Sequence, residues 1–277
     1  MKKLIEVYPQ ITKTELAAKM GVSRSMLYYH YKRPAIDEEV KRQIESVLTD
    51  HSSYGHKRIA LHLKLNKKRI LRVMKKFGIK PYKRRFKRPV KKDDLRRKPT
   101  KFKNEIEGFC PILPNIVWVT DFTYIKFQNK FIYLAVIMDL FTREILGVNI
   151  SRFHNKQLVL GALIEAINKT GIVPKYIHSD QGSEYDSKDF IDFVKSKNII
   201  ISMSRKSSPW ENGHQESFFS TLKLELGNIN RFETEGELIE NIYQTIYYYN
   251  NKRIHTKLKT TPVDFRRRYQ KTFTLVG

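Results

Sequence analysis

Residues 116–138 read IVWVTDFTYIKFQNKFIYLAVIM, and this stretch decides the fold. Residues 116–124 are rich in β-branched and aromatic side chains, and residues 130–138 form an almost unbroken apolar run after a polar break. Both compositions favour strands, and an unbroken apolar run is typical of a strand buried on both faces. We therefore predict two successive strands, the second of them central in a sheet.

The region that follows alternates between strand and helix patterns. Residues 144–151 predict a third strand, and residues 155–169 predict a helix with apolar side chains at helical spacing. Two short strands, 175–178 and 199–203, flank a predicted helix at 187–197. Three antiparallel strands followed by alternating helices and strands fit an RNase H-like α/β fold.

Three carboxylates lie in or next to the predicted strands and helices. Asp121 lies in the first strand, Asp180 follows the short apolar run that ends at Ile177, and Glu216 opens a helical segment. Gly182 permits a tight turn where a larger side chain would crowd a metal ion or a phosphate. Carboxylates that meet in a fold bind Mg²⁺ or Mn²⁺, and two such ions stabilise both oxygens of a phosphoryl transfer. We expect Asp121, Asp180 and Glu216 to be catalytic and to hold two metal ions.

Further polar residues accompany Glu216. Lys223 lies seven residues beyond it, about two helical turns on the same face, where its ammonium would reach a phosphate of DNA. Asn212 lies on that face as well, so we expect it to contact DNA. The opposite face carries three apolar residues expected to pack into the core: Phe218, Leu222 and Leu226.

Three other acids near these positions are given different roles. Asp139 also ends a strand and competes with Asp121 as the first metal ligand, but we assign it to capping the turn before Arg143. Glu184 and Asp186 are expected to face solvent.

Positive charge is concentrated in the first third of the chain. The net charge is +25, and residues 1–104 hold 31 Lys and Arg against 9 Asp and Glu, a net +22. A generally basic protein would not concentrate its charge in this way, so we expect double-stranded DNA as the partner.

Cysteine content and hydropathy bear on location. Cys110 is the only cysteine, which excludes an intramolecular disulfide or a cysteine-rich zinc site and fits a reducing bacterial cytoplasm, close to the nucleoid. The first 30 residues lack an apolar signal sequence, and no apolar stretch approaches the length of a membrane-spanning helix.

Two helix-turn-helix modules are predicted upstream of the sheet, at 1–33 and 36–81. In the first, a second helix would present Arg24 and Ser25 to a major groove, although a hairpin used only for packing has the same pattern. In the second, the last helix buries apolar residues and exposes a basic face, which is either a DNA contact or a solvated surface. The basic residues expected to touch DNA there are Lys67, Lys68, Arg72 and Lys75.

The remaining segments complete the division of the chain. Residues 82–108 are predicted to be a basic linker in which Arg84 and Arg85 follow DNA phosphates. Residues 109–226 form the catalytic core, and 227–277 a helical tail in which Arg253 and His255 contact either DNA or a neighbouring domain.

Several stretches together resemble one family. Residues 118–123, 178–185 and 203–206, with YLAVIMDLFTR at 133–143, ESFFSTLKLE at 216–225 and YNNKRIHTKLKTTP at 249–262, are similar to D-D-E transposases with a retroviral-integrase-like core. The chain looks most like the second-reading-frame proteins of the insertion-sequence-three family of bacterial mobile elements. The resemblance implies binding of element ends, metal-dependent 3′-end cleavage and strand transfer. It also implies a homo-oligomer on DNA and an upstream-frame protein as a partner or fusion.

One stretch departs from the family pattern. Glu211-Asn212-Gly213 stands where relatives commonly carry Asp-Asn-Ala, which puts the preference for end sequence in doubt rather than the chemistry. Three other functions remain open from the residues. A metal-dependent nuclease of the same fold would cut without joining, and a non-catalytic regulator would only bind. A tyrosine recombinase would need a spacing of Arg, His and Tyr that fits this chain poorly.

Overall fold

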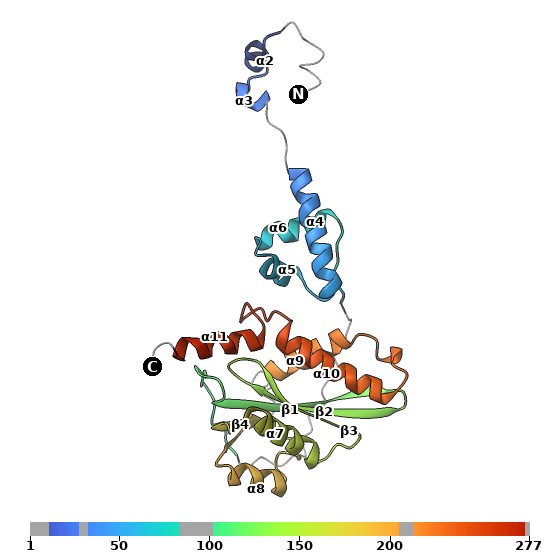
Figure 1. Cartoon of the computed structure of the whole chain (residues 1–277), viewed down its shortest axis with the longest axis vertical. Helices are drawn as coiled ribbons and strands as arrows, with labels where there is room; N and C mark the ends of the chain where they lie inside the picture. Colours follow the sequence, from blue (N-terminus) through green and yellow to red (C-terminus); the bar gives the residue numbers. More distant parts are fainter. Residues whose placement is uncertain (1–10, 28–32, 84–101, 205–212, 275–277) are drawn as a thin grey trace.

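A five-stranded mixed sheet forms the centre of the molecule (Figure 1). The structure, a computed structural model, describes residues 11–27, 33–83, 102–204 and 213–274, with side chains to residue 270. The strands are β1 (Val117–Phe127), β2 (Lys130–Asp139), β3 (Ile145–Ser151), β4 (Tyr176–Ser179) and β5 (Ile200–Met203), in the order β3-β2-β1-β4-β5. β1, β2 and β3 pair antiparallel, whereas β4 and β5 run parallel to β1.

All five predicted strands are confirmed within a few residues. The prediction that β2 lies inside the sheet is confirmed. β2 is paired on both sides, which explains its apolar run, but the middle strand is β1. An apolar composition indicates that a strand is buried on both faces. It does not indicate which of the interior strands, β1 or β2, is the middle one.

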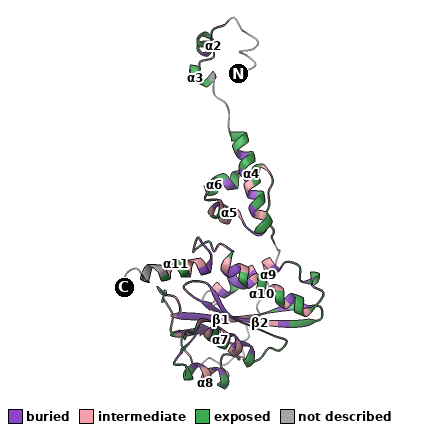
Figure 2. Ribbon diagram, in the orientation of Figure 1, coloured by how far each residue is buried: buried purple, intermediate pink, exposed green. Residues whose placement is uncertain are grey.

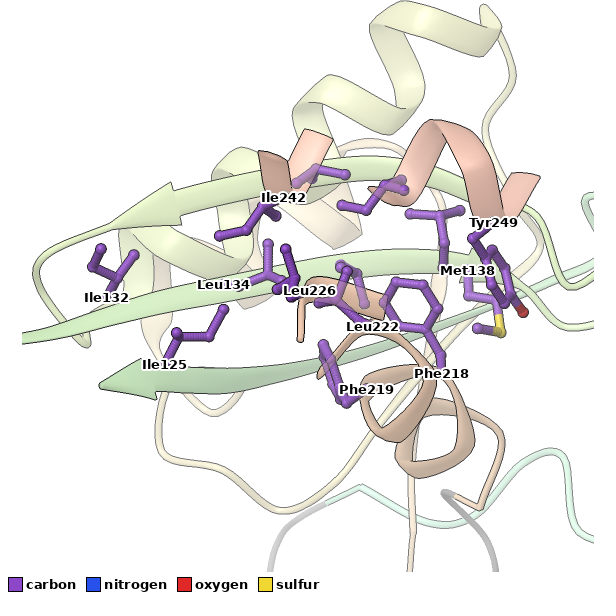
Figure 3. Packing of buried hydrophobic residues seen from close by; sticks show 14 of the residues in the cluster. Ile125, Ile132, Leu134, Met138, Phe218, Phe219, Leu222, Leu226, Ile242 and Tyr249 are labelled. Atoms are coloured by element: carbon purple, nitrogen blue, oxygen red, sulfur yellow. The ribbon is translucent and has the colours of Figure 1, made fainter. Parts of the chain in front are cut away.

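Helices cover both faces of the sheet. One face packs against α7 (Lys156–Thr170) and α8 (Lys188–Ser196), with Trp118 of β1 fully buried there. The other face packs against α9 (Gly213–Leu226), the 3₁₀ turn η2 (Ile229–Arg231) and α10 (Glu235–Asn251). Figure 3 shows Phe218, Leu222 and Leu226 of α9 facing the sheet, as their spacing predicted. Figure 2 shows the resulting buried layers on either side of the strands.

The segment predicted to be a helical tail packs into the core. Leu238, Ile242, Ile246 and Tyr249 of α10 belong to the same hydrophobic cluster as the sheet. Arg266 of α11 (Pro262–Thr274) also pairs with Glu144 before β3, at 2.6 Å.

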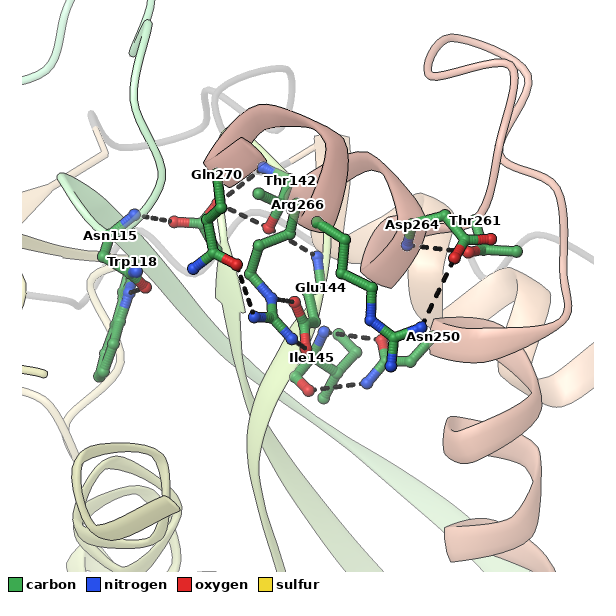
Figure 4. A network of polar contacts seen from close by, with 12 residues as sticks. Asn115, Trp118, Thr142, Glu144, Ile145, Asn250, Thr261, Asp264, Arg266 and Gln270 are labelled. Atoms are coloured by element: carbon green, nitrogen blue, oxygen red, sulfur yellow. Dashed lines mark hydrogen bonds and ion pairs between the residues drawn. The ribbon is translucent and has the colours of Figure 1, made fainter. Parts of the chain in front are cut away.

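Polar contacts strengthen this attachment (Figure 4). The Asn250 side chain exchanges two hydrogen bonds with the backbone of Ile145, and Asp139, Thr142 and Asn115 form a further set beside them. The helices after residue 227 therefore pack in the same core as the sheet. Hydrophobic spacing within α10 predicted a helix, but not its partner.

The end of the predicted linker also joins the core. Met203 donates its backbone N–H to the carbonyl of Lys103, and Glu105 donates to the Ser202 hydroxyl. Phe102 and Ile106 pack against the two core clusters. Residues 102–106 thus lie along β5, while most of the predicted linker, with Arg84 and Arg85, lies outside the described residues.

Two groups of helices precede the sheet. α2 (Lys13–Lys19) begins with a capping box between Thr12 and Glu15, and α3 (Arg24–Leu27) follows a left-handed turn at Gly21. α4 (Arg33–Asp50), α5 (His56–Leu63) and α6 (Lys67–Lys76) enclose their own small core around Ile44, Ile59 and Ile70. Asn66 caps α6, because its side chain accepts the Lys68 N–H. Gly78 ends α6 in a left-handed conformation.

The three-helix unit α4–α6 contacts the end of α10 through polar groups. His51 hydrogen-bonds to the Tyr248 hydroxyl at 2.7 Å, and Arg58 donates to the Ile254 carbonyl. The Tyr54 hydroxyl accepts the Ile254 N–H. No helix in the described part of the chain has the length and apolar character needed to span a membrane.

Gly147 provides a test of how α7 sits on the sheet. A Cβ at Gly147 would overlap the Ala162 carbonyl oxygen and lie 2.8 Å from the Ala166 nitrogen, so Gly147→Ala should lower the free energy of unfolding by about 1–3 kcal/mol. Gly236→Ala is the matched control: the nearest atom to its Cβ is 3.9 Å away, in the first turn of α10, and the change should stabilise by about 0.5 kcal/mol. Urea denaturation of both variants checks the pair. Equal effects would show that the close approach of α7 to β3 does not limit stability.

Candidate active site

Asp121 lies inside β1, and Asp180 directly follows the end of β4, the neighbouring parallel strand. β1 and β4 are in register at Val119 and His178, and each aspartate follows two residues later in its own strand direction. The side chains of Asp121 and Asp180 therefore come from equivalent positions and project from the same face of the sheet. The adjacency that the sequence predicted for these two acids is present.

A buried tyrosine lies beside both aspartates. The Tyr185 hydroxyl is fully buried and lies 3.3 Å from Thr120 Oγ1. Burial raises the pKa of Tyr185 well above its ordinary value, and the negative charges of Asp121 and Asp180 raise it further. Tyr185 thus remains a neutral hydrogen-bonding group close to the two carboxylates.

The turn after Asp180 is built around Gly182. The Gly182 N–H donates to Asp180 Oδ1 at 3.0 Å. A Cβ at Gly182 would lie 3.0 Å from that oxygen and 2.8 Å from Glu184 Oε2, so any larger residue would have to displace a carboxylate. The sequence correctly predicted a crowded turn at Gly182, and the crowding by a metal ion or phosphate stays a prediction.

Glu184 was expected to face solvent, and that expectation was wrong. Glu184 is buried and its carboxylate pairs with His154 Nε2 at 2.8 Å. His154 in turn packs between Phe122 of β1 and Tyr133 of β2, with ring centroids 4.5 and 5.2 Å away. Glu184 therefore connects the Asp180 turn to the strand that carries Asp121. No local pattern signals this pairing, because the partners are 30 residues apart and on different elements.

Glu216 and Lys223 both lie on α9. Glu216 is exposed in the first turn, and Lys223 donates from Nζ to Thr123 Oγ1 at 2.7 Å. This hydrogen bond joins α9 to β1 two residues beyond Asp121. Among the described residues, no three His, Cys, Asp or Glu side chains are arranged as a group that could hold a metal ion. The structure brings Asp121 and Asp180 together and leaves Glu216 on the neighbouring helix.

Asp139, the alternative first metal ligand, is buried and accepts hydrogen bonds from within the protein. It is 1% exposed, and its carboxylate accepts from the backbone of Asn115 and Thr142, each at 2.6 Å, and from the Thr142 hydroxyl. Burial raises the pKa of Asp139, while these hydrogen bonds oppose that rise. The predicted capping role of Asp139 is confirmed.

Comparison with known proteins places this arrangement in a family. Residues 113–209 match the family described as Integrase core domain, and residues 197–262 match a second family of the same description. The chain is 35% identical to the transposase for insertion sequence element IS904 of Lactococcus lactis over 85% of its own length and 98% of that protein. It is 30% identical to the putative transposase InsK for element IS150 of Escherichia coli over 96% and 97% of the two lengths.

The chain belongs to the IS3 family of integrase-like transposases. It shares its fold with a solved simian T-cell lymphotropic virus intasome, with a TM-score of 0.51 at 18% identity, covering 81% of this chain and 74% of that one. The RNase H-like fold predicted from the order of strands and helices is that of the integrase core.

The basic residues of this transposase are distributed over three regions. Arg24 and Ser25 are exposed on α3, and Lys67, Lys68 and Lys75 are exposed on α6. Three residues expected to contact DNA lie outside the described residues: Arg84, Arg85 and Asn212.

Arg72, on the same α6 face, has a partner within the protein. Its guanidinium forms a bidentate pair with the buried Asp37 at 2.6 and 2.8 Å, and Lys76 binds the same carboxylate. Hydrogen bonds from Arg72 and then from Lys76 hold the pKa of Asp37 well below its usual range. Arg72 therefore fixes α6 against α4, and any contact with DNA would compete with this pair.

Arg253 and His255 were each expected to contact either DNA or a neighbouring domain. Arg253 is 3% exposed and pairs with Glu225 of α9 at 2.8 Å, so of its two predicted roles the structure shows the packing contact. Burial, followed by the positive charge of Arg143 and Arg58, lowers the pKa of His255 to about 4. The imidazole of His255 is therefore neutral at neutral pH and would not attract a phosphate as a cation.

Proposed function

We propose that Asp121, Asp180 and Glu216 are the catalytic carboxylates of this transposase. The observation that carries the proposal is the equivalent placement of Asp121 and Asp180, each two residues beyond the paired Val119 and His178 of adjacent parallel strands. The hydrogen bond from Lys223 to Thr123 supports the third member, because it holds the Glu216 helix against the same strand. Seven residues separate Glu216 from Lys223, a rise of about 10 Å along the helix.

The donor set fits hard divalent cations. Asp121, Asp180 and Glu216 offer only carboxylate oxygens, which Mg²⁺ and Mn²⁺ prefer, and no sulfur or imidazole donor belongs to the set. We propose that these acids hold two ions. Such ions, when bound, stabilise negative charge on phosphate oxygens and lower the pKa of an attacking hydroxyl.

The remaining groups position the site and the DNA. The Gly182 N–H orients Asp180, and the Glu184–His154 pair fixes the turn that carries it. The Lys223 ammonium is placed to contact a phosphate close to Asp121. These fixed groups hold the reacting phosphodiester in one orientation, which is the principal requirement of in-line transfer.

We further propose that the helices before the sheet bind the element ends. The exposed lysines of α6 supply phosphate contacts, and the helix that carries Arg24 and Ser25 enters a major groove. We propose the division of the chain into two helix-turn-helix modules, a basic linker and a core that includes α10. Assembly as an oligomer on DNA, with an upstream-frame protein as a partner, completes the proposal.

A joining assay tests the catalytic proposal. Purified protein is incubated with labelled element-end DNA and a target plasmid, with Mg²⁺ or with EDTA, beside Glu216→Gln. Joined products that require Mg²⁺ and disappear in Glu216→Gln are expected. Cleavage without joining would support a nuclease instead, and DNA binding with neither activity would support a regulator.

Lys223 gives a graded test of phosphate contact. Lys223→Met should weaken binding of element-end DNA about tenfold at low salt and reduce the slope of log K against log salt by about one. Lys223→Arg should keep most of the affinity because it retains the charge. Fluorescence anisotropy across a salt series measures both quantities, with Lys130→Met, an exposed lysine at the start of β2, as the control. An unchanged slope for Lys223→Met would show that Lys223 serves only to hold Thr123.

A further inference from the structure

Two aromatic rings are exposed at the far end of the β1–β2 hairpin. Tyr124 is 57% exposed and Phe131 is 46% exposed. Their rings meet edge to face, with centroids 5.4 Å apart and planes at 89°. Large apolar rings left in water are informative, because burying them is favourable and these two have not been buried.

Strand register explains why the rings share one surface. Tyr124 is opposite Tyr133 and Lys126 is opposite Phe131, so these four side chains project from the same face of the hairpin. The alternate residues Ile125 and Ile132 project from the other face into the core cluster shown in Figure 3.

The helix on this side stops short of the exposed rings. Tyr133 packs in part against the cluster formed with α7, but Tyr124 and Phe131 lie beyond it. We name Tyr124, Lys126, Phe131 and Tyr133 the hairpin face.

The hairpin face is linked directly to the candidate active site. Tyr124 lies three residues after Asp121 on β1, about 10 Å along the strand. Lys223 Nζ, which hydrogen-bonds to Thr123, lies 5.6 Å from the centroid of the Tyr124 ring. A cation placed to contact a phosphate is therefore also in contact with an exposed aromatic ring. Phe122 and His154 continue the aromatic surface along β1, on the face opposite to the side chain of Asp121.

We propose that the hairpin face is a stacking surface for unpaired bases of the DNA strand whose phosphate lies at the candidate active site. This inference rests on the catalytic role proposed for Asp121, Asp180 and Glu216. Exposed aromatic rings beside lysines are the usual combination for single-stranded nucleic acid, since every base offers a face for stacking and the lysines meet the backbone. A paired duplex offers no free base face to Tyr124 or Phe131, so the surface selects bases released from pairing.

Stacking at Tyr124 would assist the reaction by holding the end of the element open. A base on Tyr124 is removed from its partner strand, which leaves the phosphate near Lys223 and Asp121 accessible. Tyr124 and Phe131 are then positioning residues for the reaction.

The test uses a base that reports its own stacking. Element-end DNA carries 2-aminopurine in a short single-stranded overhang, and a second substrate carries it in a fully paired end. Binding is measured in EDTA, so that no cleavage is needed. Wild-type protein should quench the overhang signal and bind that DNA more tightly than the paired end. Tyr124→Leu and Phe131→Leu should each lose about tenfold in affinity for the overhang only, and Tyr124→Phe should retain both affinity and quenching.

Control variants separate the possible outcomes. Tyr247→Leu removes another highly exposed tyrosine, 61% exposed on α10, and should leave overhang binding unchanged. Unchanged overhang affinity in Tyr124→Leu would overturn the inference, as would an equal loss for paired DNA. A change in oligomeric mass without a change in DNA affinity would also overturn it and assign the face to a protein partner. Asp121→Asn should quench like wild type while failing to join DNA, so stacking and catalysis fail independently.

Discussion

Asp180→Asn should reduce the rate of DNA joining by about a thousandfold or more. The asparagine keeps the shape of the side chain and its acceptor oxygen for the Gly182 N–H. It removes the negative charge that the proposed metal site needs, and loss of about 4 kcal/mol of transition-state stabilisation corresponds to this factor. Asp121→Asn should behave alike, because Asp121 occupies the equivalent place on β1.

Binding and stability measurements locate the cause of that loss. Calorimetric titration with Mn²⁺ should show weaker binding in both variants, while thermal unfolding and affinity for element-end DNA stay near wild type. Asp192→Asn, which alters an exposed carboxylate on α8, is the matched control and should keep full activity. Joining at a wild-type rate by Asp180→Asn would remove Asp180 from the catalytic set.

Arg253→Ala should lower the free energy of unfolding by about 3 kcal/mol or more. Arg253 and Glu225 form an ion pair whose side chains are 3% and 11% exposed, and Ser53 also donates to Glu225. Removing one partner leaves the other charge desolvated without compensation, which is the costly case for a buried pair. Because Ser53 belongs to the loop between α4 and α5, the loss should also loosen that unit from the core.

Chemical denaturation and DNA titration together assess Arg253. Arg267→Ala is the control, since Arg267 is 66% exposed, lies 3.8 Å from Asp264 and should contribute no more than about 1 kcal/mol. The double variant Arg253→Met, Glu225→Leu should recover much of the lost stability. The salt dependence of DNA binding should be unchanged in Arg253→Ala. A slope reduced by about one, with stability intact, would restore the DNA contact that the buried position argues against.

Local pattern was sufficient for most elements of the core. The β-branched and aromatic residues of β1 and the apolar run in β2 correctly predicted strands, and Phe218, Leu222 and Leu226 correctly predicted the buried face of α9. The adjacency of Asp121 and Asp180 followed from parallel strands placed side by side. The IS3-family membership followed from several short stretches taken together.

Pairings between distant elements could not be predicted in the same way. Glu184 was misjudged because its burial depends on His154, and the two roles of Arg253 stayed open because the choice depends on Glu225. The attachment of α10 to the sheet depends on Asn250 meeting Ile145, which is 105 residues away. A single side chain carries no local sign of the partner it will meet.

The sequence by itself determined the strands, the helices, the identity of the acids and the excess of positive charge. These follow from periodicity, composition and capping, which act over a few residues. Tertiary structure alone decided which charges are buried in pairs, which aromatic rings stay in water and which helices complete the core. The physical reason is that desolvation and packing depend on all neighbours in space. The contacts of the Lys223 ammonium with Thr123 and Tyr124, for example, join its helix to β1.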